Sequence, residues 1–466
     1  MELAKDAISG AGRADGQGFA GILNGTTTLG GAERETVFSP TRWPIDATVA
    51  AAAPEAAIVS SDPLSAIDWG SRVPATVIDV YFAPAGTYID GVTDLGPSQG
   101  FTAFEKRMVF SALEQIENVT NLDFRETTSP SVAEFRLGTF DLPEGVVSFM
   151  EPPGGAYSGF MGIDPYYFRA YDIDSGNPLL SRGGYVYAFI LHELGHGLGL
   201  AHPHDEGGSS TILQGVDAPW HSYGVGDLNQ GVFTMMSWNH GWPGGPYGDE
   251  YYDGTYLYVN DFGYEATPMA LDIAVLQRKY GANLGHATGD TVYRLPATNG
   301  FGTFFESIWD AGGTDTIRYD GHADAIIDLR PATLQGEVGG SGFVSYAAGI
   351  RGGFTIAAGT VIENATGAAG DDTLTGNGAA NLLQGRLGND TIDGGAGNDT
   401  LRGGAAFDSL LGGGGADLVF GDDGRDTAYL GAGNDLYRDN AQGGDLGRDT
   451  VFGGVGDDTV QGGNGA

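Results

Sequence analysis

Gly394-Gly395-Ala396-Gly397-Asn398-Asp399-Thr400-Leu401 is the stretch that decides the fold of the C-terminal part of the chain. It fits the nine-residue repeat G-G-x-G-x-D-x-U-x, in which a glycine-rich turn leads into a short strand. Glycine permits the turn because it adopts backbone conformations that other side chains forbid. The aspartate position recurs every nine residues and resumes after a five-residue insertion, at Asp372, Asn381, Asp390, Asp399, Asp408, Asp417, Asp426, Asp435, Asp449 and Asp458. The sequence therefore predicts a parallel β-roll over residues 366–466.

The aspartates of this repeat predict calcium sites. The turns direct carbonyl oxygens inward and each aspartate adds a carboxylate, so adjacent turns offer the all-oxygen ligand set that Ca²⁺ takes. Without the ion the stacked carboxylates repel one another, and we expect the segment to be disordered. The expected repeat ligands are Asp372, Asp390, Asp399, Asp417, Asp426, Asp435, Asp449 and Asp458. A flexible Gly/Asp linker is the competing interpretation, but a linker has no reason to hold an apolar residue (Leu374, Ile392, Leu401, Leu410) two positions after the aspartate.

Three turns depart from the repeat. Asn381 replaces the aspartate, Ala406 replaces a glycine, and Asp422 replaces the second glycine. We expect these turns to bind calcium more weakly or to serve only as structure.

The composition of the whole chain excludes several classes of protein. The 466 residues include 22 basic and 60 acidic ones, and the net charge of −38 excludes a general affinity for nucleic acid or anionic membranes. The absence of cysteine excludes disulfides and thiolate metal sites. No apolar stretch approaches the roughly 18 residues of a membrane helix, and no N-terminal signal peptide is visible.

Composition also divides the chain into four segments. Residues 1–62 are rich in Ala, Gly, Ser and Thr and are expected to be a mobile leader or pro-segment. Residues 63–281 have an ordinary globular composition, residues 282–365 carry turn-separated apolar stretches typical of β structure, and residues 366–466 hold the repeats. The clearest predicted elements are a strand at Val77–Phe82 and helices at Phe101–Asn118, Tyr185–Leu200 and Pro268–Tyr280.

The strongest chemical motif is His192-Glu193-Leu194-Gly195-His196-Gly197-Leu198-Gly199-Leu200-Ala201-His202. Histidines four residues apart share one face of a helix and can hold one metal between their rings. Gly199 marks the position where the helix must break, so that His202 returns as a third ligand. Three neutral imidazoles leave one position of Zn²⁺ open to water, which is typical of a catalytic site. A bare H-E-x-x-H is more often a packed histidine pair, but the longer motif fixes five positions.

The other residues near this motif have less distinctive contexts. Glu193 lies within reach of a water on the metal and is the candidate catalytic base. We expect His204 to be a solvated surface histidine rather than a fourth ligand, and His221 and His240 to be structural or surface groups. The extended zinc motif of the metzincins also calls for a methionine-containing turn beneath the metal. Thr234-Met235-Met236-Ser237-Trp238 supplies it, and Met236 is the candidate because the Met-Ser-aromatic order fits best.

These residues together resemble the serralysins, which are bacterial secreted zinc metalloproteases of the metzincin clan. The resemblance extends over residues 62–466 through the zinc motif, the methionine turn, Asp272–Asn283, Thr288–Tyr293, Trp309–Thr316, Ile362–Ala365 and the repeats. It implies an α/β metzincin catalytic domain followed by an all-β parallel β-roll. It also implies further calcium ligands: the carbonyls of Ala287 and Gly289, then Thr291, Asp310, Gly312, Asp315 and Glu363.

The resemblance further implies partners and a location. Members of the family leave the cell through a type I secretion channel, act on proteins or peptides, and meet a proteinaceous inhibitor; we expect a monomer that does not insert into a membrane. Three features depart from the family. Trp238 stands where a tyrosine usually serves as an additional zinc ligand, so that ligand is lost unless Tyr223 or Tyr247 replaces it. Residues 1–60 match nothing in the family, and the hydrophobic C-terminal export signal is absent, so we expect a truncated chain or a different export route.

The sequence thus predicts a secreted zinc-dependent endopeptidase that calcium stabilises. His192, His196 and His202 would hold the zinc, and Glu193 would act as general base. Trp238 could donate a hydrogen bond to the oxyanion, because an indole N–H donates but does not ligate. The alternative is a calcium-dependent surface or matrix-binding protein whose protease domain is weak or inactive, which Trp238 favours and the intact Glu193 opposes.

Overall fold

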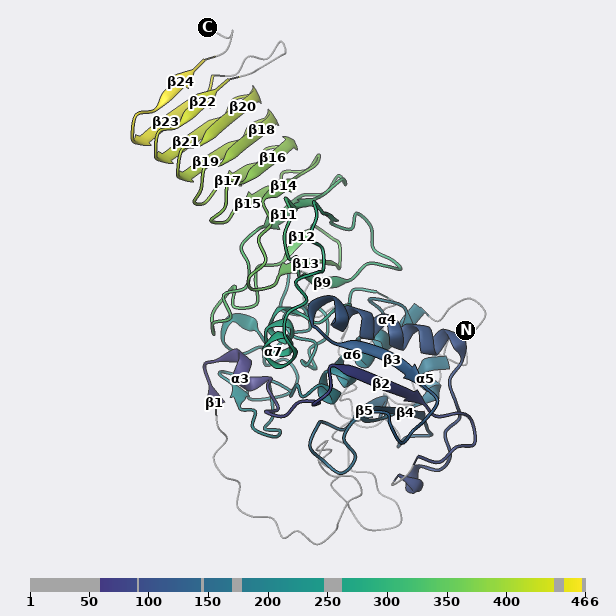
Figure 1. The fold of residues 1–466 in the computed structure, drawn as a ribbon. Coiled ribbons are helices and arrows are strands. Elements are labelled where there is room, and N and C mark those ends of the chain that lie inside the picture. The colour runs from purple at the N-terminus through teal and green to yellow at the C-terminus, as the bar shows by residue number, and fades with distance from the viewer. Residues whose placement is uncertain are drawn as a thin grey trace. The chain divides into compact units, whose positions relative to one another are not determined.

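A computed structural model of the chain describes residues 59–89, 92–143, 146–169, 178–246, 262–439 and 448–462 (Figure 1). Most of the expected leader, residues 1–58, lies outside the described residues. The chain forms two compact units. The first ends at Asn283 and also includes Gly300–Phe304 and Leu334–Gly340, and the second consists of Leu284–Asn299, Phe305–Thr333 and Ser341–Ala466.

The first unit is built around a five-stranded sheet of order β3-β2-β4-β6-β5. Four strands run parallel, and β5 pairs antiparallel with β6 at one edge. The apolar residues of β2 that alternate along the strand, Ile78 and Val80, are fully buried. The strands are β2 Val77–Phe82, β3 Asp123–Thr127, β4 Phe135–Thr139, β5 Ser148–Met150 and β6 Phe160–Ile163. The predicted strand at Val77–Phe82 is therefore confirmed at both ends.

Three long helices complete the first unit, at α4 Ala103–Val119, α6 Tyr185–Gly197 and α7 Ala270–Tyr280. The predicted helices are all present: the start of α6 at Tyr185 and the end of α7 at Tyr280 coincide with the prediction, and the other ends are shifted by one to three residues. The shift at α4 has a local cause, because Thr102 and Glu105 form a capping box in which each side chain accepts from the other's backbone N–H. Short elements are α3 Pro63–Ala66, α5 Pro165–Arg169, the 3₁₀ turns η1 Thr93–Leu95, η2 Pro178–Leu180 and η3 Val225–Asp227, and the parallel pair β1 Val59–Ser60 and β7 Ile212–Leu213.

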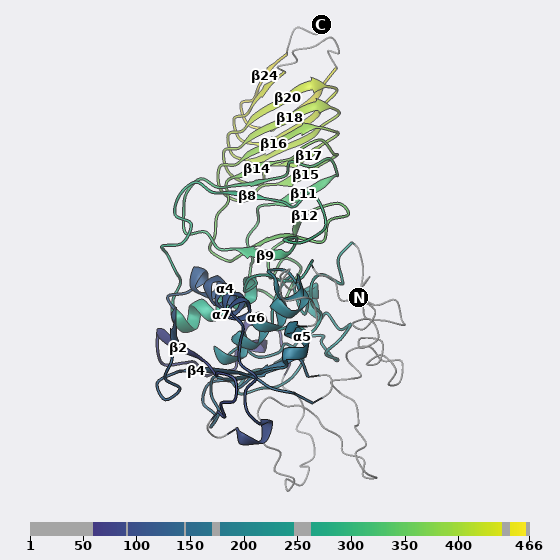
Figure 2. The ribbon, with the colours of Figure 1, turned by 90° about the vertical axis from the view of Figure 1, so that its right-hand side faces the viewer.

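The second unit consists of two sheets of mostly parallel strands (Figure 2). One has the order β24-β22-β20-β18-β16-β14-β10-β8, and the other β23-β21-β19-β17-β15-β11-β12-β13-β9. The strands before the repeat are β8 Val292–Arg294, β9 Phe305–Ile308, β10 Thr316–Arg318, β11 Ala325–Asp328, β12 Ser345–Ala347, β13 Gly353–Ile356 and β14 Asn364–Thr366. The repeat strands are β15 Thr373–Thr375, β16 Leu382–Leu387, β17 Thr391–Asp393, β18 Thr400–Ala406, β19 Ser409–Gly414, β20 Leu418–Gly424, β21 Thr427–Ala432, β22 Leu436–Arg438, β23 Thr450–Val455 and β24 Thr459–Gln461.

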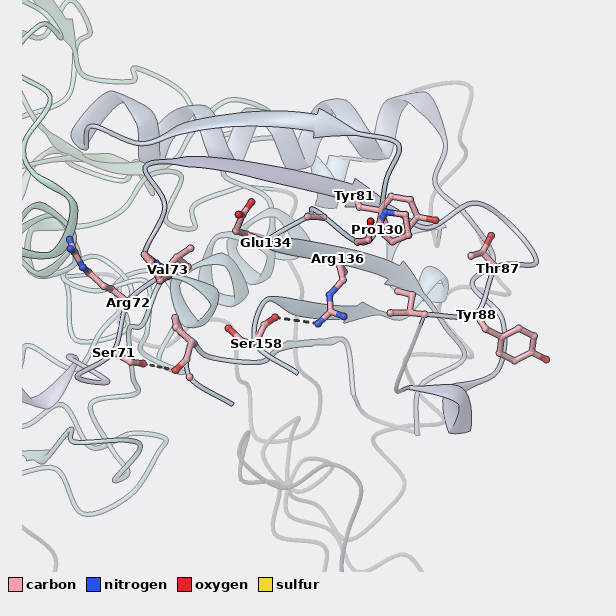
Figure 3. Close-up of a pocket in the computed structure, with 16 residues that line it drawn as sticks. Ser71, Arg72, Val73, Tyr81, Thr87, Tyr88, Pro130, Glu134, Arg136 and Ser158 are labelled. Atoms are coloured by element: carbon pink, nitrogen blue, oxygen red, sulfur yellow. Dashed lines mark hydrogen bonds between the residues drawn. The ribbon is translucent and has the colours of Figure 1, made fainter. Parts of the chain in front are cut away.

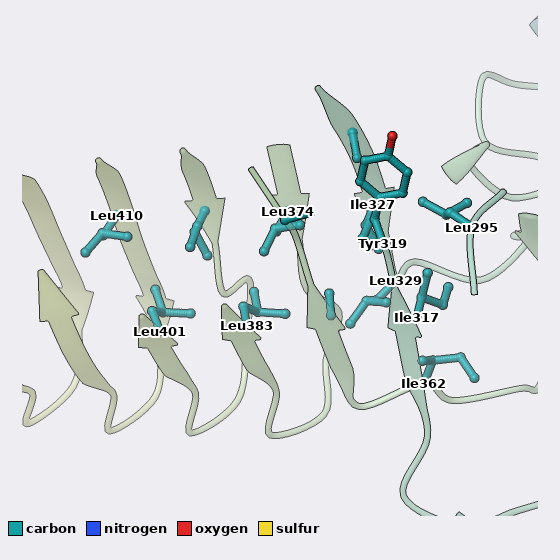
Figure 4. Close-up of a cluster of buried hydrophobic side chains, with 14 of the residues drawn as sticks. Leu295, Ile317, Tyr319, Ile327, Leu329, Ile362, Leu374, Leu383, Leu401 and Leu410 are labelled. Atoms are coloured by element: carbon teal, nitrogen blue, oxygen red, sulfur yellow. The ribbon is translucent and has the colours of Figure 1, made fainter. Parts of the chain in front are cut away.

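The register of these sheets confirms the nine-residue frame. Leu401 lies opposite Leu383, eighteen residues earlier, because one coil of the roll contains two repeats, one strand in each sheet. Thr427 pairs with Thr450, so the separation between paired residues grows by five where the sequence has its insertion. From Leu374 to Tyr437 the apolar residue of each repeat points inward and is buried, as Leu374 and Leu410 illustrate (Figure 4), whereas Val460 in the last described coil is exposed. The architecture is the predicted one, an α/β unit followed by a parallel β-roll.

Candidate metal centre

Helix α6 carries the first two histidines on one buried face. Its residues from Tyr185 to Gly197 are almost all buried, so the helix passes through the interior of the first unit. Two of its glycines are required by packing. A Cβ at Gly195 would lie 2.6 Å from the sulfur of Met236, and one at Gly197 would lie 2.3 Å from the terminal methyl carbon of Met150. The small residues of the motif therefore let the methionine turn and β5 approach the helix.

The turn after α6 returns His202 to the helix. Gly199 adopts a left-handed conformation with φ of +87°, and a Cβ there would lie 2.2 Å from the carbonyl oxygen of Ser71. Leu200 donates its N–H to the carbonyl of Gly195 at 2.9 Å, which closes the helix end. Ala201 donates to the carbonyl of Ile67 at 3.0 Å, so the segment before β2 holds the turn from outside. The predicted break at Gly199 is present.

The three histidines converge through their Nε2 atoms. The Nε2 of His202 lies 3.1 Å from that of His192 and 3.0 Å from that of His196. Their Nδ1 atoms face the carbonyl of Met235 at 2.8 Å, the carbonyl of Leu200 at 3.1 Å and the carboxylate of Asp205 at 3.0 Å, respectively. These groups are acceptors, so each Nδ1 carries the proton and each Nε2 presents a lone pair.

Three lone pairs directed at one point fit a metal cation. Burial and the neighbouring histidines hold the pKa of His192 well below its ordinary value, and burial lowers that of His196 to about 3, so protons do not fill the space between them. Tetrahedral zinc with ligands at about 2.0–2.1 Å places nitrogen atoms about 3.3 Å apart, within a few tenths of the separations here. The hydrogen bonds to Nδ1 are the outer contacts that fix ring orientation in zinc sites.

Glu193 follows the first histidine and its carboxylate is buried. Ser148 on β5 donates its hydroxyl to Oε1 at 3.1 Å, and the backbone of Met150 also hydrogen-bonds to the carboxylate. Burial raises the pKa of Glu193 to about 8 in the ion-free protein. Neither Ser148 nor Met150 was predicted from sequence. Their positions in a short strand 45 and 43 residues away carry no motif that could have indicated them.

The methionine turn lies directly beneath the histidines. Met235 and Met236 are fully buried, and the carbonyl of Met235 is the acceptor for His192. Met236, the sequence candidate, contacts Gly195 of α6 through its sulfur. A further residue holds this turn: Asp272 accepts hydrogen bonds from the Thr234 hydroxyl at 2.7 Å and from the Met235 N–H at 2.7 Å. No sequence motif indicates this role of Asp272.

The repeat aspartates form two ladders along the roll. In each ladder one carboxylate oxygen accepts the backbone N–H of the residue eighteen positions earlier, as in Asp399 from Asn381 at 2.8 Å and Asp417 from Asp399 at 2.9 Å. The other oxygen, Oδ2, is buried and has no hydrogen-bond partner within the described residues in six successive turns: Asp390, Asp399, Asp408, Asp417, Asp426 and Asp435. A Cβ at Gly394 would lie 2.6 Å from the carbonyl oxygen of Gly412 and 2.7 Å from Oδ2 of Asp399. Buried anionic oxygens beside carbonyls fit Ca²⁺.

Asp408 belongs to one of these ladders of aspartates although it is not among the calcium ligands expected from the sequence. Asp408 shares the buried, unpartnered Oδ2 of its neighbours although Ala406 replaces a glycine in its turn. Ala406 and Asp422 accept the positive φ that glycine would take, at 97° and 64°. The backbone of both substituted turns therefore keeps the shape of the repeat. The nine-residue spacing alone could have identified Asp408 as a calcium ligand, because it lies nine residues from both Asp399 and Asp417.

Known proteins are similar to this chain in sequence. Residues 282–459 match the model of the peptidase M10 serralysin C-terminal family. The chain is 31% identical to serralysin G of Dickeya chrysanthemi over 309 residues. This aligned region covers 62% of this chain and 58% of that protein. The chain is thus similar to serralysins over about three fifths of its length, and its C-terminal part matches a serralysin family model.

Two other relatives give the same result. A metallopeptidase AprA of Pseudomonas marginalis is 31% identical over 297 residues (61% of this chain, 56% of that protein), and a serralysin of Proteus mirabilis is 30% identical over 305 residues (61% and 56%). The chain thus spans less than three fifths of the length of these serralysins.

The calcium ligands implied by the serralysin resemblance lie close together in the second unit. The Oδ1 of Asp315 accepts the N–H of Thr291 at 2.7 Å, and the N–H of Asp315 donates to Oε2 of Glu363 at 2.8 Å. The Oδ2 of Asp315 is buried without a partner within the described residues, and burial with nearby carboxylates raises its pKa to about 6. Asp310 accepts from the N–H of Gly312 at 2.9 Å. The remaining candidates, Ala287 and Gly289, lie in the loop that leads to Thr291.

His204 differs from its sequence expectation. We expected a solvated surface histidine, but its side chain is only 5% exposed. Its ring stacks on that of His202 at 4.8 Å between centroids, and Trp238 packs against it at 4.6 Å. Burial lowers the pKa of His204 to about 3. The prediction was wrong because Trp238, 34 residues away in sequence, covers the ring.

Trp238 is the residue that the resemblance places where serralysins usually have a tyrosine. Its ring lies 5.4 Å from that of His202 and 5.6 Å from that of Trp220. Of the two tyrosines considered as replacements, Tyr247 lies outside the described residues, and Tyr223 accepts the N–H of Asn229 through its carbonyl. His240 is structural as expected, because it is buried and its Nδ1 contacts Glu265 at 2.7 Å. His221 is exposed on the surface.

A cavity of about 600 Å³ lies elsewhere in the first unit (Figure 3). Tyr81 and Ile89 line part of it, and Arg136 of β4 donates a long hydrogen bond to the carbonyl of Ser158 at 3.4 Å. None of the three histidines or Glu193 lines this cavity. It is therefore separate from the candidate metal centre.

Proposed function

We propose that this chain is a secreted zinc-dependent endopeptidase whose C-terminal roll is stabilised by calcium. The observation that carries the proposal is the convergence of three unprotonated Nε2 atoms beside the buried carboxylate of Glu193. His192, His196 and His202 would hold one Zn²⁺. When bound, the ion supplies a Lewis acid that polarises a carbonyl and lowers the pKa of water.

The side chains around the centre then have distinct tasks. Glu193 would take the proton of the attacking water on its carboxylate and pass it to the leaving amine. The hydroxyl of Ser148, at 3.1 Å from Oε1, keeps this carboxylate oriented. Asp205 and the carbonyls of Met235 and Leu200 hold the three imidazoles in the tautomer that leaves Nε2 free.

Strand β5 offers a place for an extended peptide substrate. It is the edge strand of the sheet, and its only strand partner in the described residues is β6. Ser148 and Met150 of the same strand contact Glu193. An extended peptide that adds to this edge would pass beside the catalytic carboxylate, in the manner of β-augmentation. Protein or peptide substrates are therefore proposed, with no preference for a particular side chain.

Calcium would bind at the two sets of oxygens in the second unit. The six buried Oδ2 atoms of successive turns need positive partners, since a buried bare carboxylate oxygen is costly. The proposed ligands before the repeat are Ala287, Gly289, Thr291, Asp310, Gly312, Asp315 and Glu363. Those in the repeat are Asp372, Asp390, Asp399, Asp408, Asp417, Asp426 and Asp435, with Asp458 at the last described turn.

A location outside the cell agrees with these sites. Extracellular calcium modules typically bind with dissociation constants of about 10⁻⁴–10⁻³ M, so the roll would stay unfolded in the cytosol and fold after export. No helix among the described residues is long and apolar enough to cross a membrane. The family resemblance suggests a type I secretion system and a proteinaceous inhibitor as partners.

The alternative function is calcium-dependent binding to a surface or matrix by a chain whose protease domain is weak. The observation in its favour is Trp238, which packs against His202 in the place of the family's tyrosine. The retained Glu193, with two hydrogen-bond partners of its own, opposes this alternative.

Zinc content and casein hydrolysis of the wild type and of Glu193→Ala separate the two functions. The proposed endopeptidase requires about one zinc per chain in both proteins and hydrolysis in the wild type alone. A wild type that binds zinc without hydrolysing casein would support the binding protein. Equal hydrolysis by both proteins would remove Glu193 from the mechanism.

A further inference from the structure

Asp449 differs in its partners from the six repeat aspartates whose Oδ2 is bare. Asp372, at the other end of the row, also has a partner on Oδ2, but there the donor is the backbone N–H of Ala368 at 2.6 Å. In Asp417 and the five other aspartates described above, Oδ1 accepts a backbone N–H and Oδ2 is buried without a partner within the described residues. Asp449 also receives a backbone N–H on Oδ1, from Asp426 at 3.0 Å. Its Oδ2, however, accepts the phenolic hydroxyl of Tyr437 at 2.8 Å.

Tyr437 reaches this carboxylate from inside the roll. It occupies the inward row of its sheet, opposite Val419 on one side and Val460 on the other, and is only 1% exposed. The repeat places a small or aliphatic residue at this position in the preceding coils, such as Leu401. The phenol has room because Gly421 has no side chain: a Cβ there would lie 2.4 Å from the hydroxyl oxygen.

The phenol remains a donor under all ordinary conditions. A tyrosine phenol has an ordinary pKa of about 10, so at neutral pH it carries its proton. The hydroxyl therefore stays protonated and directs its positive end at Oδ2. A second pair of the same kind, Tyr293 and Asp310 at 2.7 Å, stands in the first strand of the same sheet. There the carboxylates of Asp315 and Glu363 lie nearby, whereas Tyr437 is the phenol that faces a repeat aspartate.

We propose that the hydroxyl of Tyr437 takes the place of a calcium ion at Asp449, so that calcium binding in the ladder of Asp390, Asp408 and Asp426 ends before this residue. The proposal rests on the calcium role proposed above for the other turns. Where Oδ2 is bare, an ion must supply the positive partner; at Asp449 the chain supplies it itself. The hydroxyl thus occupies one side of Oδ2 in Asp449, whereas in the six other turns this oxygen is bare.

The test is the number of calcium ions bound per chain at saturating calcium, measured on the full chain by equilibrium dialysis. Asp449→Asn keeps an acceptor for the Asp426 N–H and is expected to bind as many ions as the wild type. Asp417→Asn, the matched change in a turn with a bare Oδ2, is expected to bind at least one ion fewer. Tyr437→Phe keeps the ring, frees Oδ2 of Asp449 and is expected to bind one ion more. Tyr429→Phe, an exposed tyrosine of β21, is the control and keeps the wild-type number.

Two results would overturn the proposal: a loss in Asp449→Asn equal to that in Asp417→Asn, or no gain in Tyr437→Phe. The comparison with Asp449→Asn does not depend on whether Tyr437→Phe folds. If Asp417→Asn binds as many calcium ions as the wild type, the aspartates of the repeat do not bind calcium and the proposed function of the roll is wrong. This outcome is distinguishable from failure of the Tyr437 proposal, because it is measured on a different variant.

Discussion

Asp272 holds the backbone of Met235 from the first turn of α7. Its buried Oδ2 accepts the N–H of Met235 at 2.7 Å, and the carbonyl of Met235 faces Nδ1 of His192 at 2.8 Å. The same carboxylate accepts the Thr234 hydroxyl and the N–H of Met269 at 2.9 Å. One side chain therefore caps a helix, shapes the methionine turn and, through it, orients a candidate zinc ligand.

We predict that Asp272→Ala lowers zinc affinity by about 10–100-fold, the usual cost of removing an outer partner of a metal ligand. It also leaves buried donors unpaired, each at a cost of about 1–3 kcal/mol, so the first unit should unfold at lower temperature. Zinc competition with a chelator and thermal unfolding measure the two effects. Asp123→Ala, which removes an exposed partner of Arg125, is the control and should change neither. Wild-type zinc affinity in Asp272→Ala would show that Met235 is held by other contacts.

The third histidine gives a sharper prediction. His202→Ala removes one of three nitrogen ligands and should abolish proteolysis and most zinc binding, while the calcium-loaded second unit stays folded. Asp205 is the one outer partner that is a side chain, so Asp205→Ala should weaken zinc binding by about 10-fold, less than the loss of the ligand itself. Metal analysis after dialysis ranks the two variants. Full activity in His202→Ala would exclude the three-histidine site.

Sequence predicted the parts of this molecule that depend on periodicity. The nine-residue frame contains its own register, because the residues that pair across coils are the same positions of the repeat. Strand β2 and helix α6 follow from local apolar patterns, and the three histidines follow from a motif whose spacing is set by a helix and one left-handed glycine. These features need no knowledge of distant packing.

Sequence did not predict the contacts that join distant segments. His204 appeared solvated because nothing near it in sequence indicates that Trp238 covers its ring. Ser148 reaches Glu193 from another element of the fold, and Asp272 reaches Met235 across 37 residues. Tyr437 satisfies the apolar position of its repeat, so the pattern does not reveal that its hydroxyl binds Asp449. Each of these depends on which side chains the folded chain brings together.

Calcium and pH should substitute for one another in folding the roll. In the ion-free protein, burial raises the pKa of Asp390 and Asp426 to about 7 and that of Asp399 and Asp408 to about 6. A raised pKa in the folded state means that protonation stabilises the fold. This stabilisation is complete below the unfolded pKa of about 3.9 and is lost as pH rises through about 6–7.

We therefore predict that, after calcium removal and with zinc resupplied, the roll is disordered at pH 8 and gains strand structure at pH 5. Millimolar calcium should restore the strands at pH 8, where the carboxylates are charged. Circular dichroism at the two pH values, each with and without calcium, measures this. A calcium-free spectrum that is folded and identical at both pH values would contradict the proposed role of the ion.

The last prediction concerns the indole of Trp238. Its ring packs against His202 and His204, with centroids 5.4 and 4.6 Å apart, so it lies beside the candidate zinc ligands. In the serralysin family a tyrosine at this position can hydrogen-bond the oxyanion as it forms, and one such donor is worth about 10²–10³-fold in kcat. An indole N–H can donate the same bond, although it cannot ligate the metal.

If Trp238 serves in this way, Trp238→Phe removes the donor while it keeps much of the aromatic surface against His202. Turnover should then fall by more than KM changes, because the lost bond forms only in the transition state. Trp238→Tyr restores a hydroxyl donor and should recover turnover, which separates hydrogen bonding from packing. Steady-state kinetics on a peptide substrate, with zinc content measured for each variant, distinguishes these effects from metal loss. Unchanged kcat in Trp238→Phe would mean that the ring only packs on the histidines and that another group faces the oxyanion.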